Sequence, residues 1–201
     1  MVEKIVNHIV DCQISLGRIK QEESGVYQYG YTLFFEKLIN IAIVILICIV
    51  TNKWLEIWSF LLAVIPLRSF AGGWHANKFW QCAIISNFMV ALMLLIIDKV
   101  SIENEVIYIV FEIIVLFIIL LIIPTQNSNK PLTPAELKKY KKITIFIWII
   151  ECCIMSIFVI YRKYIYSIII LYTHSIIVIA AIGGKISEMR KVKRKNMQHI
   201  D

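Results

Sequence analysis

The sequence lacks the cysteine pattern of a disulfide-stapled or metal-binding protein. Its cysteines are five, an odd number without metal-ligand spacing: Cys12, Cys48, Cys82, Cys152 and Cys153. Cys152 and Cys153 are adjacent inside an apolar run, where cysteine acts as a small hydrophobic residue. We therefore predict no disulfides, no metal, no cofactor and an active region on the reducing side of a membrane.

We also expect no cleavable leader, no internal repeat and no separate soluble domain. The first 30 residues mix acids and amides with apolar positions, and no short apolar core precedes a small-residue cleavage site. No stretch between the apolar segments is long enough for a soluble domain. We expect one integral membrane domain, 1–201, with an uncleaved N-terminal region.

Long apolar runs are what the chain has in abundance, with 59% hydrophobic residues and a mean hydropathy of +0.75. Most of the runs approach the length needed to cross about 30 Å of hydrocarbon. There are six: 33–50, 54–67, 79–97, 106–123, 143–160 and 165–182. The second is short, so four full spans plus re-entrant pieces is an alternative. The pattern predicts an all-α, polytopic membrane helical bundle over 33–182.

The N-terminal region, 1–32, has a different pattern. Apolar residues recur there at steps of three and four, which predicts an amphipathic helix over 2–20 that lies in the interface or docks on the bundle. The predicted apolar face is Val2, Ile5, Ile9, Cys12, Leu16 and Ile19. The sequence Glu22–Gly25 is expected to end this helix, and Tyr27, Tyr29 and Tyr31 to form an interfacial aromatic belt.

Basic residues flank the apolar spans, so the net charge of +7 indicates membrane topology rather than nucleic-acid binding. If the N-terminus is cytoplasmic and all six segments cross, the inside holds 16 Lys and Arg residues and the outside 4. This bias predicts a multi-pass protein of the cell membrane with both termini in the cytoplasm. The basic tail, 183–201, is predicted to bind anionic lipid, with peptide binding or a role in topology alone as the alternatives.

The most polar interruption of the apolar pattern is Arg68–Cys82, which contains His75 and a glycine pair. A cysteine attacks as its thiolate, and a nearby imidazole or a helix N-terminus stabilises that anion. Seven residues of unbroken helix rise about 10.5 Å, which is too far for contact between Cys82 and His75. The chain must therefore bend, and Gly72 and Gly73 provide the freedom to do so.

The supporting roles in this stretch have alternatives. Backbone amides with Asn77 or Gln81 could stabilise an oxyanion, and Arg68 either binds a substrate carboxylate or extends to lipid headgroups. By pattern alone, Cys82 also fits a core residue and His75 a solvated loop residue.

Three polar residues fall near the middle of their apolar segments, namely Glu112, Glu151 and His174. Charged groups at that depth normally pair with one another. We predict a buried hydrogen-bonded cluster joining segments four, five and six, with either a structural role or a proton or transport role.

The string Arg68, Ala71-Gly72-Gly73, His75-Ala76 and Cys82 resembles the accessory gene regulator B family, the membrane cysteine endopeptidases of Gram-positive peptide quorum sensing. The resemblance covers essentially the whole chain and includes Tyr29-Gly30, Pro124 and Lys130-Pro131. One departure is the segment 127–129, which carries no basic residue before Lys130. Lys138 and Lys139, with Lys141 and Lys142, are the candidates to compensate for it.

The resemblance implies that Cys82 is the nucleophile and His75 the general base. The implied substrate is a short propeptide with an amphipathic N-terminal helix and an acidic C-terminal part. Cleavage would leave a thioester on Cys82, which an internal Cys or Ser of the peptide resolves into a thiolactone or lactone. The N-terminal helix and Lys130, Lys138 and Lys139 are candidate substrate contacts, and a homodimer is one option for assembly. The alternative function is a non-enzymatic exporter or scaffold for a small peptide.

Overall fold

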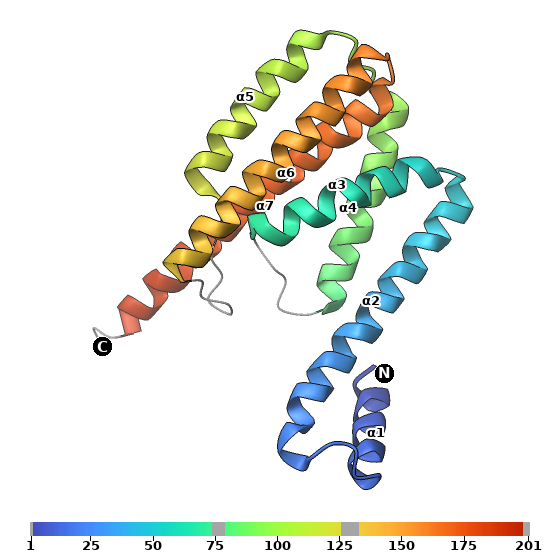
Figure 1. The fold of residues 1–201 in the computed structure, drawn as a ribbon, viewed down its shortest axis with the longest axis vertical. Coiled ribbons are helices and arrows are strands. Elements are labelled where there is room, and N and C mark those ends of the chain that lie inside the picture. The colour runs from blue at the N-terminus through green and yellow to red at the C-terminus, as the bar shows by residue number, and fades with distance from the viewer. Residues whose placement is uncertain (1, 74–78, 126–132, 199–201) are drawn as a thin grey trace. The chain divides into compact units, whose positions relative to one another are not determined.

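The computed structural model describes residues 2–73, 79–125 and 133–198, without the side chains of residues 79, 80, 82 and those beyond 190. The described residues are almost entirely helical, which confirms the all-α prediction (Figure 1). The elements are α1 Val2–Ser15, η1 Gln21–Glu23, α2 Ser24–Thr51, α3 Trp54–Ala71, α4 Phe79–Lys99, α5 Glu105–Ile122, α6 Pro134–Ile160 and α7 Tyr164–Gln198.

Five of the described helices are long and apolar enough to cross a membrane: α2 together with η1, α3, α5, α6 and α7. The remaining predicted segment, 79–97, coincides with α4. Many large apolar side chains on these helices are exposed, among them Ile113, Phe117 and Leu121 of α5. Outward apolar surface of this extent matches lipid as the surrounding solvent.

Helix α3 is longer than the predicted 54–67 segment. It passes through Pro66 and ends at Ala71, so it has 18 residues and reaches the lower bound for a span. It ends there because Gly72 adopts a positive φ of 72°, a conformation that a right-handed helix cannot continue.

The chain divides into two compact units, of which the first comprises Met1–Asn52 and Lys78–Asn87. In this unit α1 packs on α2 and buries Val6 and Val10. Gln13 Nε2 donates a hydrogen bond of 2.7 Å to the Tyr31 hydroxyl. These two valines lie outside the predicted apolar face, of which Ile5 is 46% and Leu16 62% exposed.

Helix α1 also ends earlier than predicted, at Ser15. Gly17 has a φ of 67°. Its N–H bonds to Ile14 O, and the Arg18 N–H bonds to Gln13 O. This pair of bonds around a left-handed glycine is the Schellman motif, which closes a helix C-terminus. The predicted stop at Glu22–Gly25 instead lies at η1 and the start of α2, so the three tyrosines of the expected belt lie on the first turns of α2.

The second unit comprises Lys53–Asn77 and Phe88–Asp201. Here α6 and α7 run alongside each other, α3 packs against both, and α5 packs on α7 (Figure 1). One apolar core joins the end of α3 to α5 and α7 through Leu67, Ala71, Val115, Ile119, Ile123, Ile177, Val178 and Ala181. A second core, near the α6–α7 turn, contains Tyr108, Met155, Val159 and Ile170.

Candidate functional site

The glycine pair directly after α3 is held by the segment that follows α5. The Thr125 N–H donates a hydrogen bond of 3.1 Å to the Ala71 carbonyl oxygen, and Gly72 pairs with Thr125 as an isolated parallel bridge. A Cβ atom on Gly72 would overlap the Thr125 carbonyl oxygen and lie 3.2 Å from Thr125 Oγ1. This close approach, with the positive φ, requires glycine.

Gly73 is constrained by the backbone of α7, and less strictly by the flexible Arg68 side chain of α3. Its φ is 119°, and a Cβ atom there would overlap Arg68 Nη1 and lie 2.9 Å from the Ala180 carbonyl oxygen. Arg68 is half-buried beside this glycine. We call the set Ala71, Gly72, Gly73, Thr125 and Ala180 the glycine junction.

The glycine junction brings distant parts of the chain to one end of the second unit. The Lys141 ammonium donates a hydrogen bond of 2.6 Å to Leu120 O at the end of α5. The rings of Phe70 and Tyr140 meet edge to face at 5.6 Å. The residues after α3, those after α5 and the start of α6 therefore share one end. These are two of the loops predicted to face the cytoplasm, and their common side agrees with the predicted topology, whose absolute orientation stays a prediction.

Cys82 is the fourth residue of α4, which begins at Phe79. This is the position near a helix start that the sequence predicted. Within the first unit, Asn87 Nδ2 donates a hydrogen bond of 2.7 Å to Asn40 Oδ1 of α2. The first half of α4, which carries Cys82, is thereby tied to α2.

Several predicted site residues lie outside the described residues, namely His75, Asn77 and Lys130. Gln81 is in the first turn of α4 and half-buried. Lys138 and Lys139 are exposed near the start of α6. That start is fixed by a capping box, in which Thr133 Oγ1 accepts from the Glu136 N–H and the Glu136 carboxylate accepts from the Thr133 N–H.

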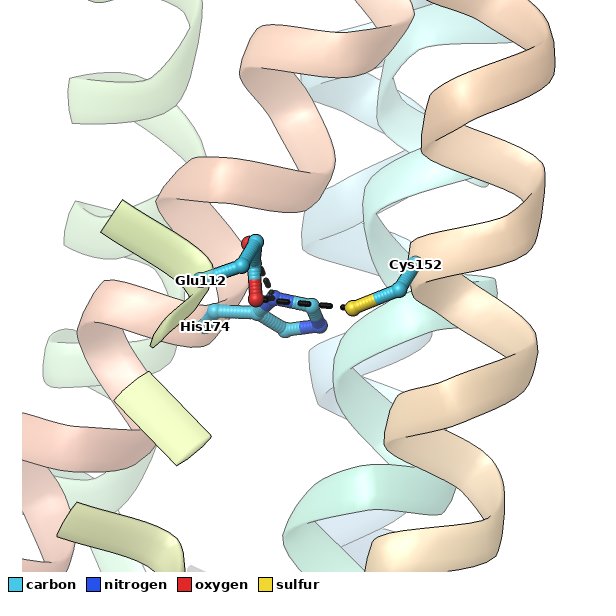
Figure 2. Close-up of side chains that lie close together, drawn as sticks. All are labelled: Glu112, Cys152 and His174. Atoms are coloured by element: carbon cyan, nitrogen blue, oxygen red, sulfur yellow. Dashed lines mark hydrogen bonds and ion pairs between the residues drawn. The ribbon is translucent and has the colours of Figure 1, made fainter. Parts of the chain in front are cut away.

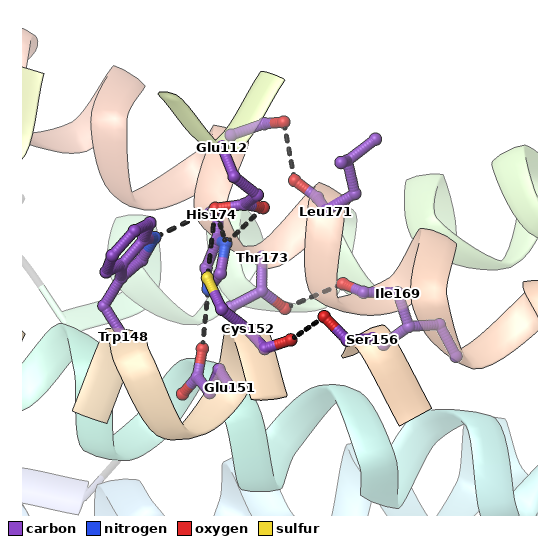
Figure 3. Close-up of polar contacts among 10 residues, drawn as sticks. Glu112, Trp148, Glu151, Cys152, Ser156, Ile169, Leu171, Thr173 and His174 are labelled. Carbon is purple, nitrogen blue, oxygen red and sulfur yellow. Dashed lines mark hydrogen bonds and ion pairs between the residues drawn. The ribbon is translucent and has the colours of Figure 1, made fainter. Parts of the chain in front are cut away.

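The predicted buried cluster is confirmed by the structure (Figure 3). His174 of α7 is fully buried, and its Nδ1 lies 2.8 Å from Glu112 Oε1 of α5. Its Nε2 lies 2.9 Å from Glu151 Oε2 of α6. Each ring nitrogen faces a carboxylate, so the two contacts need at least two protons among the three side chains.

Two members of this cluster were not predicted. The Trp148 indole N–H donates a hydrogen bond of 2.9 Å to Glu112 Oε2, and Cys152 Sγ lies 3.5 Å from the same oxygen. The reading of Cys152 as a small hydrophobic residue was therefore wrong. Its spacing was the available signal, because Glu151 and Cys152 lie three and four residues after Trp148 on α6.

Long apolar helices that bury a hydrogen-bonded polar cluster and expose apolar surface elsewhere define a multi-pass α-helical membrane protein. The family described as Accessory gene regulator B matches residues 2–182. The chain therefore belongs to this family, which is involved in accessory gene regulation and peptide quorum sensing.

Curated relatives carry related names. The protein is 23% identical over 176 residues to Protein FsrB of Enterococcus faecalis. The aligned region covers 86% of this chain and 69% of FsrB. It is 29% identical over 136 residues to an AgrB-like protein of Listeria monocytogenes, covering 67% of this chain and 66% of that protein. The chain thus spans about two thirds of the length of these relatives. No solved structure matches it significantly.

Proposed function

We propose that this protein is a membrane cysteine endopeptidase that cleaves a short propeptide of a quorum-sensing signal. Cys82 acts as the nucleophile and His75 as the general base. The observation that carries the proposal is the position of Cys82 in the first turn of α4, within a chain that belongs to the accessory gene regulator B family. The partial positive charge of a helix start favours the thiolate that such a reaction needs.

The reaction moves an acyl group twice. His75 takes the thiol proton, and the Cys82 sulfur forms a bond to the carbonyl carbon at the C-terminal end of the future signal. The C–N bond breaks, and the amine of the C-terminal fragment leaves with the proton from His75. An internal thiol or hydroxyl of the peptide then attacks the thioester. The C–S bond to Cys82 breaks, and a thiolactone or lactone ring closes while Cys82 regains its proton.

A membrane site suits this second step. Transfer of an acyl group between two thiols is nearly neutral in free energy, whereas hydrolysis of the thioester is strongly downhill. Ring closure therefore wins only where water is kept away and the internal nucleophile is held close to the thioester. A cysteine at the start of an apolar helix, at the edge of the bilayer, favours both conditions, since lipid limits water and keeps an amphipathic peptide at the same depth.

Substrate binding draws on two exposed surfaces. The outward face of α1, with Ile5 and Leu16, offers apolar area to an amphipathic helix of the propeptide. Lys138 and Lys139, exposed on α6, offer positive charge to its acidic C-terminal part.

The test is co-expression of candidate propeptides with wild-type protein, Cys82→Ser, His75→Ala and the matched control Cys153→Ser. We expect Cys82→Ser to abolish processing and His75→Ala to slow it by about 10²–10⁴-fold. Cys153 is an exposed cysteine of α6 that the proposed reaction does not use, so Cys153→Ser should process normally.

A hydroxylamine-labile peptide adduct on Cys82, found by mass spectrometry, would identify the thioester directly. Intact processing by both Cys82→Ser and His75→Ala would overturn the proposal and favour the alternative, an exporter or scaffold for a small peptide.

A further inference from the structure

The buried cluster places three different metal-ligand atoms together. Glu112 of α5, Cys152 of α6 and His174 of α7 each offer one ligand atom, and these atoms lie within 4.8 Å of one another (Figure 2). They are a carboxylate oxygen, a sulfur and an imidazole nitrogen. Zn²⁺ binds all three types at about 2.0–2.3 Å, which puts its ligand atoms roughly 3.3–3.8 Å apart. The cluster needs only small shifts to reach that spacing.

The groups around these three atoms have the arrangement of a metal site's outer shell. A metal-bound histidine usually donates its other ring N–H to a carboxylate, and a metal-bound carboxylate usually accepts a further hydrogen bond. His174 Nε2 lies 2.9 Å from Glu151 Oε2, which leaves Nδ1 for the metal on the side of Glu112. The Trp148 N–H orients Glu112 through Oε2 at 2.9 Å.

The charge of the cluster also favours a cation. Glu112 and Glu151 are 7% and 6% exposed, and His174 lies between them. Among the residues that the structure describes, no donor reaches the buried Glu151 Oε1. An unsatisfied buried carboxylate oxygen is costly, and a nearby cation lowers that cost.

We propose that Glu112, Cys152 and His174 bind a divalent transition metal ion, with Zn²⁺ the best match, and that the ion clamps α5, α6 and α7 together. Zn²⁺ with the Glu112 carboxylate and the Cys152 thiolate is electrically neutral. Binding releases the thiol proton and one proton shared between His174 and Glu112, and the remaining imidazole N–H donates to Glu151. The donor set of one oxygen, one nitrogen and one sulfur favours Zn²⁺ over Mg²⁺ or Ca²⁺, which take oxygen ligands. This inference does not depend on the proposed peptidase activity.

The first test uses Co²⁺ as a spectroscopic probe on the full-length protein in detergent. The protein should carry no histidine tag and be kept reduced by a phosphine that does not bind metals. We expect a single equivalent of Co²⁺ to give visible ligand-field bands and a near-ultraviolet thiolate-to-cobalt band, both lost on adding Zn²⁺. Cys152→Ser should remove the thiolate band, and the matched control Cys153→Ser should keep it. Absence of the band in folded wild-type protein, or its survival in Cys152→Ser, overturns the proposal.

A second measurement needs no variant, so it stands even if substitutions in the cluster prevent folding. The wild-type protein is alkylated with a membrane-permeant maleimide with and without Zn²⁺, and each cysteine is followed by mass spectrometry. Zn²⁺ should slow alkylation of Cys152 at least tenfold and leave the exposed Cys12 and Cys153 unchanged. Equal rates at Cys152 with and without Zn²⁺ would exclude a metal–sulfur bond there.

Discussion

Gly72 and Gly73 differ from Gly17, Gly25 and Gly30 in what a side chain would meet. At Gly17 the φ is also positive, yet a Cβ atom would meet nothing within 4 Å. At Gly30, within α2, there is neither a positive φ nor a neighbour. Alanine substitutions at Gly30, Gly17 and Gly73 therefore test no strain, backbone strain alone, and backbone strain with steric overlap.

Gly73→Ala should destabilise the protein far more than Gly17→Ala. Strained backbone costs about 1–3 kcal/mol and overlap with a packed backbone about 1–3 kcal/mol more. Gly17→Ala should show only a cost of about 1–2 kcal/mol, and Gly30→Ala should be neutral or stabilising by up to about 1 kcal/mol. Thermal unfolding in one detergent measures all three. If the Gly73→Ala protein were as stable as the Gly17→Ala protein, the residues of the glycine junction would be able to shift without loss of stability, contrary to this prediction.

At the residue scale the sequence was most informative about buried charge. Glu112, Glu151 and His174 were predictable as a cluster because three ionisable groups at one depth have few other partners in lipid. The presence of Trp148 and Cys152 in the cluster was not predicted, because both side chains are largely apolar and lie within an apolar run. The contacts of Gly72 and Gly73 with Thr125 and Ala180 were not predictable, because chain flexibility says nothing about which distant backbone comes near.

At the scale of elements, the lysines at the start of α6 have different surroundings. Lys141 donates to Leu120 O and so closes the C-terminal end of α5. Lys138 and Lys139 are exposed. The sequence predicted that all of these lysines could compensate for the missing basic residues at 127–129. We now assign Lys141 a structural role and keep Lys138 and Lys139 as the candidates for substrate binding.

Replacing both Lys138 and Lys139 with Gln should weaken propeptide binding without changing stability. Two exposed ion pairs together contribute about 0.4–2 kcal/mol, so KM should rise by a factor of about 2–30 with kcat unchanged, and the effect should shrink at high salt. Lys141→Gln should instead lower the unfolding temperature and leave KM unchanged. Cleavage kinetics with a purified propeptide measure both, and an identical loss of stability in the two variants would contradict the assignment.

Helix α1 shows why a periodic pattern can predict an element and still miss its packing. The steps of three and four residues gave the helix correctly. Val6 and Val10, which belong to a second apolar row, form the contact with α2, and Gln13 selects this row through its bond to Tyr31. In a membrane protein an exposed apolar row is not an error, because lipid or a substrate helix can cover it.

At the scale of the whole molecule, the excess of basic residues at alternate loops predicts the orientation in the membrane. The described contacts place the residues after α3 and after α5 at one end of their unit, which agrees with that alternation. Which end faces the cytoplasm follows only from charge, because helix packing is indifferent to the two sides of a bilayer.

Cysteine labelling of intact cells tests this orientation. In a background without reactive native cysteines, Ser101→Cys in the α4–α5 turn should react with a membrane-impermeant maleimide. Ala135→Cys, in the first turn of α6, should react only after the cells are opened. Both positions are exposed, so a difference reports sidedness rather than burial. The reverse pattern would invert the topology and place Cys82 on the outer face.

The glycine junction packs three separate stretches of the chain against one another. This packing affects which segments can be exchanged between related proteins in chimeras. A chimera that imports the stretch around Gly72 and Gly73 alone must seat it against a foreign Thr125 and a foreign Ala180, each at backbone contact distance. A chimera that imports only one of the three stretches should fold poorly. A chimera that takes all three stretches from the same donor protein should fold normally. Divergence among homologous proteins is then expected to accumulate in these stretches jointly.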